Sequence, residues 1–203
     1  MSFFKPVARE HASRLLNHGP TVLVTSRSVD GSKRNVMAAA WSMPVEFMPP
    51  RIAVVIDKHT YTRELVESSG VFGICIPAAL SVDLTYAVGS ISGRVVDKFA
   101  QYGITPVSGP VLDIPLLESA CVAWLACRLI PESHTQNAYD TCFGEVLAAA
   151  ADSRVFADGK WMFGPHNQDL HTLHHLGGGN FVRAGAVLQA HPPASLATSS
   201  EKN

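Results

Sequence analysis

Two long apolar runs in the second half of the chain limit most strongly the folds that it can adopt. They cover Cys121–Ile130 and Cys142–Ala151, and the polar segment 132–140 lies between them. Apolar runs of this length are typical of strands that are buried in a sheet. We therefore predict that the two runs pair as antiparallel strands of a barrel, with the polar segment as a long connecting loop.

The first half of the chain contains a series of shorter strand patterns that turn residues separate. β-Branched and apolar residues indicate strands over 21–26, 35–41, 51–57 and 71–76. The pair Asp30-Gly31 is typical of a hairpin turn, so the first two strands are expected to be antiparallel neighbours. A second turn is expected at Asp158-Gly159. Helices are predicted over 6–17, 61–69, 82–88 and 95–102.

Strands and helices do not alternate regularly, which argues against a parallel sheet. The predicted fold class is mainly β with inserted helices, in a closed or nearly closed antiparallel barrel with Greek-key-like connections. A length of 203 residues suits one domain, which we place at 1–190. Residues 191–203 are rich in Ser, Ala, Pro and charge, so we expect a disordered tail there.

Composition excludes some classes of protein and favours a partner chain. Hydrophobic residues make up 47% of the chain and charged residues only 16%, so a second copy is expected to cover apolar surface in a homodimer. A net charge of -1 and the lack of a basic run argue against nucleic-acid binding. No apolar run reaches the roughly 18 residues of a membrane-spanning helix. Four cysteines without CxxC spacing, and no recognisable signal peptide, favour a cytoplasmic protein with buried thiols.

One strand pattern has the composition of a pocket wall. Three small residues, Ala38, Ala39 and Ala40, stand between the polar Asn35 and the large aromatic Trp41. A flat ligand can approach such a backbone closely, with polar edges on main-chain groups and apolar contact on its faces. The alternative is a tightly packed strand that needs small side chains.

A second segment has the composition of an anion site. Thr60, Tyr61 and Thr62 stand at a predicted helix start, where free N–H groups and the positive end of the helix dipole attract a phosphate. Arg27 and Lys58 are close in sequence and could add positive charge. The alternative for the two threonines is ordinary helix N-capping.

The order and spacing of several short motifs resemble the flavin reductase-like domain, and in particular its flavoredoxin branch. The resemblance covers roughly residues 10–185. The motifs are Gly19-Pro20-Thr21, Asp30-Gly31, Asn35-x-Met37, Trp41, Pro49-Pro50, Thr60-x-Thr62, Ser69-Gly70-x-Phe72, Ser92-Gly93-Arg94, Asp97-Lys98-Phe99, residues 115–120, Cys127 and Gly144-Glu145-Val146. The resemblance implies an FMN-binding split barrel.

The resemblance also implies a set of cofactor-binding residues. The strand segment would line the flavin ring and ribityl chain, the threonine segment would hold the phosphate, and Lys98 would lie near the flavin, where a cation eases reduction. For Lys98 the alternative is a solvated helix-face lysine. His174 or Phe181 could reach the flavin of the same or the partner subunit. The predicted set is Asn35, Val36, Met37, Ala38, Ala39, Ala40, Trp41, Thr60, Tyr61, Thr62, Lys98 and Phe181.

The histidines near the C-terminus suggest a metal site, because His171 and His175 would share a face if they were helical. They lead into a glycine-rich segment followed by Phe181, as in the family, so we assign them to packing or ligand contacts and predict no metal. The other two histidines of this group are His166 and His174.

The resemblance implies an FMN-dependent oxidoreductase that uses NADH or NADPH and needs no catalytic side chain. Many family members carry a Gly-Asp-His motif that suits the nicotinamide donor, but here the corresponding place reads Asn137-Ala138-Tyr139-Asp140, with His134 nearby. A flavoredoxin-like carrier that exchanges electrons with a protein partner is therefore an alternative. A non-catalytic flavin-binding or metal-binding module is a third.

Overall fold

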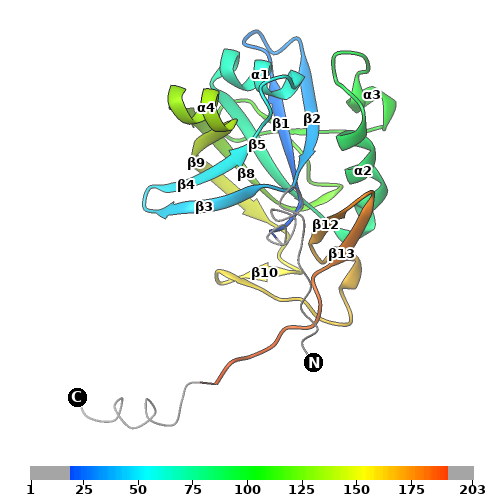
Figure 1. The fold of residues 1–203 in the computed structure, drawn as a ribbon. Helices are drawn as coiled ribbons and strands as arrows, with labels where there is room; N and C mark the ends of the chain where they lie inside the picture. Colours follow the sequence, from blue (N-terminus) through cyan, green and yellow to red (C-terminus); the bar gives the residue numbers. More distant parts are fainter. Residues whose placement is uncertain (1–18, 192–203) are drawn as a thin grey trace, which may run out of the picture.

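The computed structural model describes residues 19–191, which form a mainly antiparallel β domain (Figure 1). The helix predicted over 6–17 and the tail predicted beyond residue 191 lie outside the described residues. None of the helices in the described part of the chain is long and apolar enough to cross a membrane.

A seven-stranded antiparallel sheet forms the body of the domain, in the order β2-β1-β5-β8-β9-β4-β3. Its two edge strands, β2 and β3, are consecutive in the sequence, and only Ala40 and Trp41 stand between them. The sheet therefore curls on itself, so that its first and last strands meet at this corner (Figure 1). The strands are β1 Val22–Arg27, β2 Arg34–Ala39, β3 Ser42–Phe47, β4 Pro50–Val55, β5 Val71–Pro77, β8 Cys121–Ile130 and β9 Thr141–Ala151.

The predicted strand pairs are confirmed. β1 and β2 form a hairpin in which Val24 lies opposite Met37. In the turn, Gly31 has φ 72°, and the Asp30 carboxylate accepts hydrogen bonds from the Ser28 and Ser32 hydroxyls. These bonds hold the pKa of Asp30 at about 2. β8 and β9 also pair antiparallel, as the two long apolar runs predicted.

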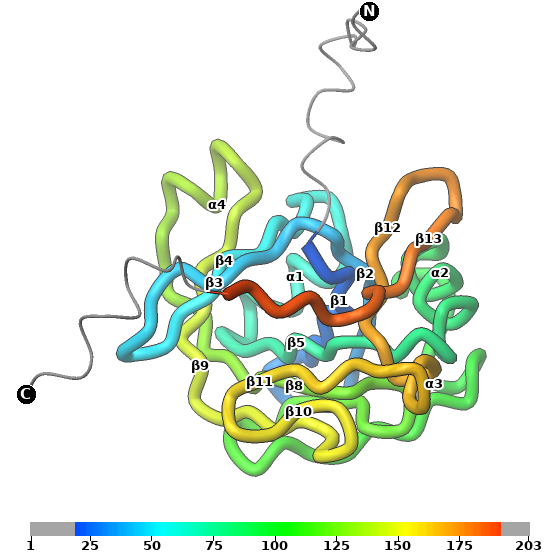
Figure 2. The backbone as a smooth tube through the Cα atoms, turned by 90° about the horizontal axis from the view of Figure 1, so that it is seen from below, coloured from blue at the N-terminus to red at the C-terminus, as the bar shows by residue number. Residues whose placement is uncertain are grey.

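Three short antiparallel pairs lie outside the main sheet: β6 Val107–Ser108 with β7 Pro115–Leu116, β10 Phe156–Ala157 with β11 Lys160–Trp161, and β12 Leu173–Gly177 with β13 Asn180–Arg183. The second predicted turn, at Asp158-Gly159, connects β10 and β11. The β12–β13 hairpin lies beside α2 in both views (Figures 1 and 2). It is fixed to the start of the main sheet by a hydrogen bond from Thr21 N to Leu173 O, at 2.8 Å.

The helices follow local capping signals. α1 Tyr61–Ser69 has the predicted bounds, since the Thr60 hydroxyl caps its first turn and Gly70, with φ 71°, ends it. In α3 Lys98–Gln101, the Asp97 carboxylate accepts the N–H groups of Phe99 and Ala100. The remaining helices are η2 Ala79–Ser81, α2 Val82–Ser90, α4 Ser133–Tyr139 and η3 Gln168–Leu170.

Three elements differ from the sequence prediction. β3 was not predicted, because Pro44 interrupts its pattern and most of its side chains are exposed. The predicted loop 132–140 contains α4, which ends at Asp140 in the left-handed conformation. The helix predicted over 95–102 begins only at Lys98, since a turn that Ser92 starts precedes it.

The core lies on both faces of the curled sheet. One cluster packs β1, β2 and β8 against α2 and α3 and includes Leu23, Val88 and Phe99. The other packs the opposite face around Phe72 and Ile56. All four cysteines are buried free thiols, as predicted. Burial raises the pKa of Cys127 to about 12 and that of Cys142 to about 11, so these thiols stay protonated at neutral pH.

Candidate functional site

Two adjoining cavities lie along β2. The first, which we call the α1 cavity, has a volume of about 310 Å³, and its lining includes the residues around the start of α1 and the loop after α2. The second, the hairpin cavity, measures about 180 Å³ and lies between β2, α2 and the β12–β13 hairpin. Both cavities share Ala38, Gly89 and Ser90, so together they form one elongated site.

Most of the predicted site residues line these two cavities, although they come from distant parts of the chain. Asn35, Met37, Ala38, Thr60, Tyr61, Thr62 and Lys98 line the α1 cavity. Ala38, Ala39, Ala40 and Phe181 line the hairpin cavity. Val36 and Trp41 line neither, since the Val36 side chain is part of the core and Trp41 is 53% exposed at the corner between β2 and β3.

Asn35 connects the two predicted segments. Its side-chain N–H donates to the Thr62 hydroxyl at 2.8 Å. The other amide atom, Oδ1, is buried and accepts no hydrogen bond from the described residues. A buried acceptor without a donor costs about 1–3 kcal/mol, so this oxygen is a site for a ligand N–H or O–H group.

Gly93 makes this arrangement of Asn35 possible. A Cβ atom at Gly93 would lie 2.1 Å from Asn35 Oδ1 and 3.0 Å from the Tyr61 ring. Any larger residue at this position would therefore displace the amide from its place beside the α1 cavity.

Lys98 supplies a buried positive charge. Its side chain is 3% exposed, so the alternative of a solvated helix-face lysine is wrong. Nζ donates to Val36 O at 2.8 Å and to Val88 O at 2.6 Å. An ammonium has three N–H donors, which leaves one for the α1 cavity that Lys98 lines. Burial lowers the pKa of Lys98 to about 8, so the side chain is mostly charged at neutral pH.

Thr60 caps the start of α1, which was the alternative interpretation of this threonine. Thr60 Oγ1 donates to Asp57 O at 2.8 Å and accepts from Arg63 N at 3.2 Å. This uses the hydroxyl but leaves the first N–H groups of the helix without intrahelical partners. Residues 59–62 line the α1 cavity, so the positive end of the helix dipole is close to it.

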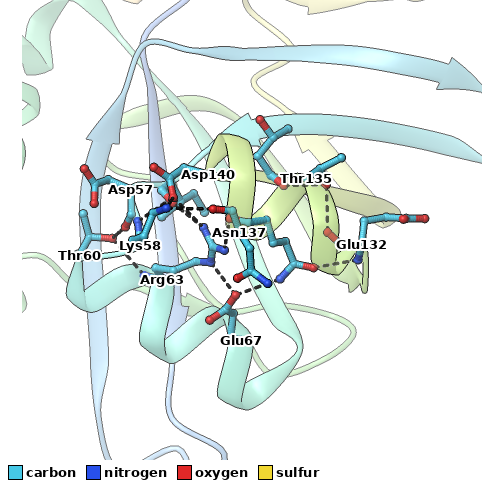
Figure 3. A network of polar contacts seen from close by, with 12 residues as sticks. Asp57, Lys58, Thr60, Arg63, Glu67, Glu132, Thr135, Asn137 and Asp140 are labelled. Atoms are coloured by element: carbon cyan, nitrogen blue, oxygen red, sulfur yellow. Dashed lines mark hydrogen bonds and ion pairs between the residues drawn. The ribbon is translucent and has the colours of Figure 1, made fainter.

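A buried arginine holds this helix start in place (Figure 3). Arg63 Nη1 donates to Ile56 O at 2.8 Å, Nη2 donates to Gln136 O at 2.7 Å, and Nε pairs with Glu67 at 2.7 Å. The guanidinium therefore joins α1 to α4 and to the end of β4. Sequence reasoning missed Arg63, because nothing local distinguishes it from an exposed helix arginine.

The two cations proposed from the sequence for the phosphate face elsewhere. Arg27 donates to Leu112 O and Asp113 O at 3.0 and 2.8 Å. Lys58 Nζ donates to Asn137 O at 2.9 Å and lies 3.6 Å from Asp140 (Figure 3). Neither lines the α1 or the hairpin cavity.

The hairpin cavity combines small residues with aromatic walls. A Cβ at Gly89 would lie 3.1 Å from the Ala38 methyl group, so α2 packs closely on β2 here. The rings of His175 and Phe181, 5.0 Å apart, come from the β12–β13 hairpin. Thr21 Oγ1 is buried beside them without a partner among the described residues, which gives this cavity a polar atom as well.

The C-terminal histidines do not share a helix face. His175 lies on β12, and the His171 ring faces Ala184 O at 2.7 Å and Gly164 O at 3.1 Å. His171 thus fixes the base of the β12–β13 hairpin. Within residues 19–191 no group of three or more His, Cys, Asp or Glu side chains is arranged to hold a metal ion.

Known proteins share the fold of this chain. The flavin reductase-like domain matches residues 14–167. The uncharacterized protein YddH of Escherichia coli K12 is 58% identical over 190 residues, which are 94% of this chain and 100% of that protein. An FMN-binding domain of a flavin reductases-like enzyme from Shewanella baltica OS155 has a TM-score of 0.79 and 42% identity, over 91% of this chain and 96% of that one. Flavoredoxin of Desulfovibrio vulgaris has a TM-score of 0.74 and 26% identity, over 96% and 98%.

Proposed function

The chain belongs to the flavin reductase-like family and has its split-barrel fold, and we propose that it is an FMN-binding oxidoreductase that takes electrons from NADH or NADPH. The Shewanella relative, at 42% identity, binds FMN by its own description, which supports the same cofactor here. The observation that carries the proposal is the pair of buried polar groups that line the α1 cavity, Asn35 Oδ1 and the Lys98 ammonium.

In the proposed arrangement the flavin ring lies in the hairpin cavity and the phosphate lies in the α1 cavity. Ala38, Ala39 and Ala40 leave space for a flat ring against β2, and Phe181 closes the opposite side. The N–H groups at the start of α1 attract the phosphate. Lys98 and Asn35 both line the α1 cavity, so they would be close to a ligand that spans both cavities.

The residues around the site would tune a bound flavin rather than react themselves. FMN supplies a ring that accepts a hydride and carries extra negative charge when reduced. The Lys98 ammonium, held in a low-dielectric position by two carbonyl groups, would stabilise negative charge on a ligand that spans the two cavities. No side-chain nucleophile or general base would be needed, because bound FMN would itself supply the hydride acceptor.

A second candidate function is a flavoredoxin-like electron carrier. One observation favours it: the segment that corresponds to the family's Gly-Asp-His motif is structural here. Asn137 O accepts from Lys58, Asp140 lies 3.9 Å from Arg63, and His134 packs edge-on against Tyr139. These contacts hold α1 and α4 in place, and none of these residues lines the α1 or hairpin cavity. A protein partner would then replace the nicotinamide as electron donor.

A homodimer is part of the proposal. The β3–β4 hairpin exposes Met43, Val45, Phe47 and Met48, and Trp41 just before it is exposed as well; Phe47 is 94% exposed. β3 is also an edge strand, whose outer backbone groups are unpaired within the sheet. A continuous apolar surface on an edge strand is a site of chain association, and a second copy of the chain would cover it.

The spectrum of the purified protein, with an anaerobic titration, tests the function. We expect an oxidised-flavin absorbance, or its recovery when FMN is added to the apoprotein. Stoichiometric NADH or NADPH should then bleach the FMN-loaded protein quickly if it is the reductase. Bleaching by dithionite but by neither nucleotide would assign the carrier instead. A protein that stays colourless and ignores added FMN would refute both functions.

A further inference from the structure

The β12–β13 hairpin forms one wall of the hairpin cavity without belonging to the main sheet. It is a two-stranded sheet of its own, and His175 and Phe181, which lie opposite each other in its register, both line the cavity. A two-stranded hairpin is only marginally stable by itself in water, so its position depends on contacts at its two ends. In Figure 2 it projects from the body of the domain beside α2.

The base of the hairpin is buried and fixed. Leu173 is 3% exposed, and its carbonyl oxygen accepts the hydrogen bond from Thr21 N at the start of the main sheet. Just beyond the ends of the two strands, Ala184 N donates to Thr172 O at 2.9 Å, and the His171 ring faces Ala184 O at 2.7 Å. This end of the hairpin is therefore suited to be a hinge.

The tip of the hairpin is rich in glycine and exposed. Gly177, Gly178 and Gly179 have positive φ angles of 104°, 59° and 80°, and residues 178–180 are exposed. The backbone at Gly179 packs on the Tyr86 ring of α2, because a Cβ atom there would lie 3.3 Å from two carbons of that ring. Contact with one ring at an exposed tip holds less strongly than burial at the base, so the hairpin opens most easily from the tip.

The groups behind the hairpin are shielded from solvent in the observed position. Thr21 is 2% exposed and Ala39 is 9% exposed, although both line the hairpin cavity. A flat ring that lies against Ala39 would be held between β2 and the hairpin. Such a ring would enter most easily while the hairpin is turned away, and it would be shielded from water once the hairpin returns.

We propose that the β12–β13 hairpin is a lid, which turns about its buried base, opens at its glycine tip to admit the flat ring of the ligand, and closes again when Gly179 meets Tyr86. The proposal rests on the proposed function, because it takes the flavin ring to lie in the hairpin cavity. A rigid wall would need neither a glycine tip nor separation from the main sheet.

Two glycine variants at the tip distinguish a lid from a fixed wall. In Gly179→Ala the new methyl group meets the Tyr86 ring at 3.3 Å, whereas in Gly178→Ala the nearest atom is Asn180 Nδ2 at 3.7 Å, within the hairpin itself. Both alanines have positive φ and bear a backbone cost of the same kind, so Gly178→Ala is the matched control.

Stopped-flow mixing of the apoprotein with FMN, followed by flavin fluorescence, gives the association and dissociation rate constants. The weaker tip contact favours the open form of the free protein and of the complex alike. We therefore expect Gly179→Ala to raise both rate constants roughly fivefold and to leave Kd within about twofold of the wild type. Gly178→Ala should match the wild type. If dissociation alone becomes faster, or if neither rate constant changes, the hairpin is a fixed wall and the inference is overturned.

A thiol probe tests the lid without any flavin. Thr21→Cys places a thiol of similar size in the cavity behind the hairpin, and the four native cysteines are buried. We expect iodoacetamide to label this cysteine severalfold faster when it is combined with Gly179→Ala than with Gly178→Ala, as measured by intact mass. Equal labelling rates in the two combinations would overturn the inference. If labelling responds to Gly179→Ala but the protein does not bind FMN, the lid stands and the proposed function fails.

Discussion

The Asn35 side-chain amide donates a hydrogen bond to the Thr62 hydroxyl at 2.8 Å, and so ties β2 to the first turn of α1. The two segments that the sequence indicated as ring wall and phosphate site are thus in direct contact. No donor among residues 19–191 reaches the remaining oxygen of the amide, so the contact both fixes the site and leaves a polar group for a ligand.

Adding one methyl group beside this amide should impair flavin binding with little effect on folding. In Gly93→Ala the new Cβ would lie 2.1 Å from Asn35 Oδ1, so the amide must move. We expect FMN affinity to fall at least tenfold, measured by fluorescence quenching. Gly185→Ala is the control, because a Cβ there meets nothing within 4 Å. Equal FMN affinity in both variants would remove Asn35 from the site.

FMN binding should depend on pH through Lys98. Its pKa is about 8 in the free protein, and a bound anion raises it, so the complex holds more protons than the free protein above that pH. Affinity should therefore fall as pH rises from about 8 to about 10, by up to tenfold per unit.

Lys98→Gln tests this assignment, since glutamine keeps N–H donors for the two carbonyl groups but has no charge. We expect it to bind FMN more weakly at pH 7 and to lose the decline above pH 8. Lys160→Gln, on exposed β11, should keep the wild-type profile. A decline that persists in Lys98→Gln would mean that another group titrates.

Arg63, in the first turn of α1, should matter for stability. Arg63→Leu leaves Ile56 O, Gln136 O and the Glu67 carboxylate without their buried donor. We expect a loss of about 3–5 kcal/mol in the free energy of unfolding, measured by urea denaturation. Arg154→Leu is the matched control, because Arg154 is exposed and its ion pair, with Asp152 two positions earlier, is at the surface; this variant should unfold like the wild type. Similar unfolding midpoints for both variants would contradict a structural role for Arg63.

The exposed hairpin should control association. Phe47→Glu with Met48→Glu places two charges on the apolar face of the β3–β4 hairpin, and we expect the dimer to dissociate in sedimentation velocity experiments. Val29→Glu charges an equally apolar exposed residue in the β1–β2 turn and should sediment as the wild type. A wild-type protein that sediments as a monomer, or a double variant that stays dimeric, would disprove this interface.

The sequence predicted those helices, turns and strands whose bounds depend on residues close together in the chain. Thr60 and Gly70 bound α1 because a hydroxyl cap and a left-handed residue act within one turn. Asp30-Gly31 fixed the first hairpin for the same reason. The long apolar run of β8 was predicted with its observed bounds, since both of its faces are buried.

Features that depend on distant contacts were not predictable in this way. β3 has an exposed, proline-interrupted pattern and is a strand only because β4 pairs with it. The Lys58 side chain points away from the site because it bonds to α4, some eighty positions later, and no local pattern in the sequence indicates this contact. The same holds for the cavity lined by Arg34, Tyr61 and Arg94, whose residues come together only in the folded chain.

The corner at Ala40 and Trp41 joins the two edges of the sheet directly after the wall of the hairpin cavity. Trp41 O accepts a hydrogen bond from Val55 N at 3.0 Å, so β4 fixes the position of this corner. An insertion or deletion here would shift the register of the closing strands and the depth of the cavity at the same time. Substitutions in α2 and in the β12–β13 hairpin can therefore change the shape of the hairpin cavity without changing how the strands of the main sheet pair.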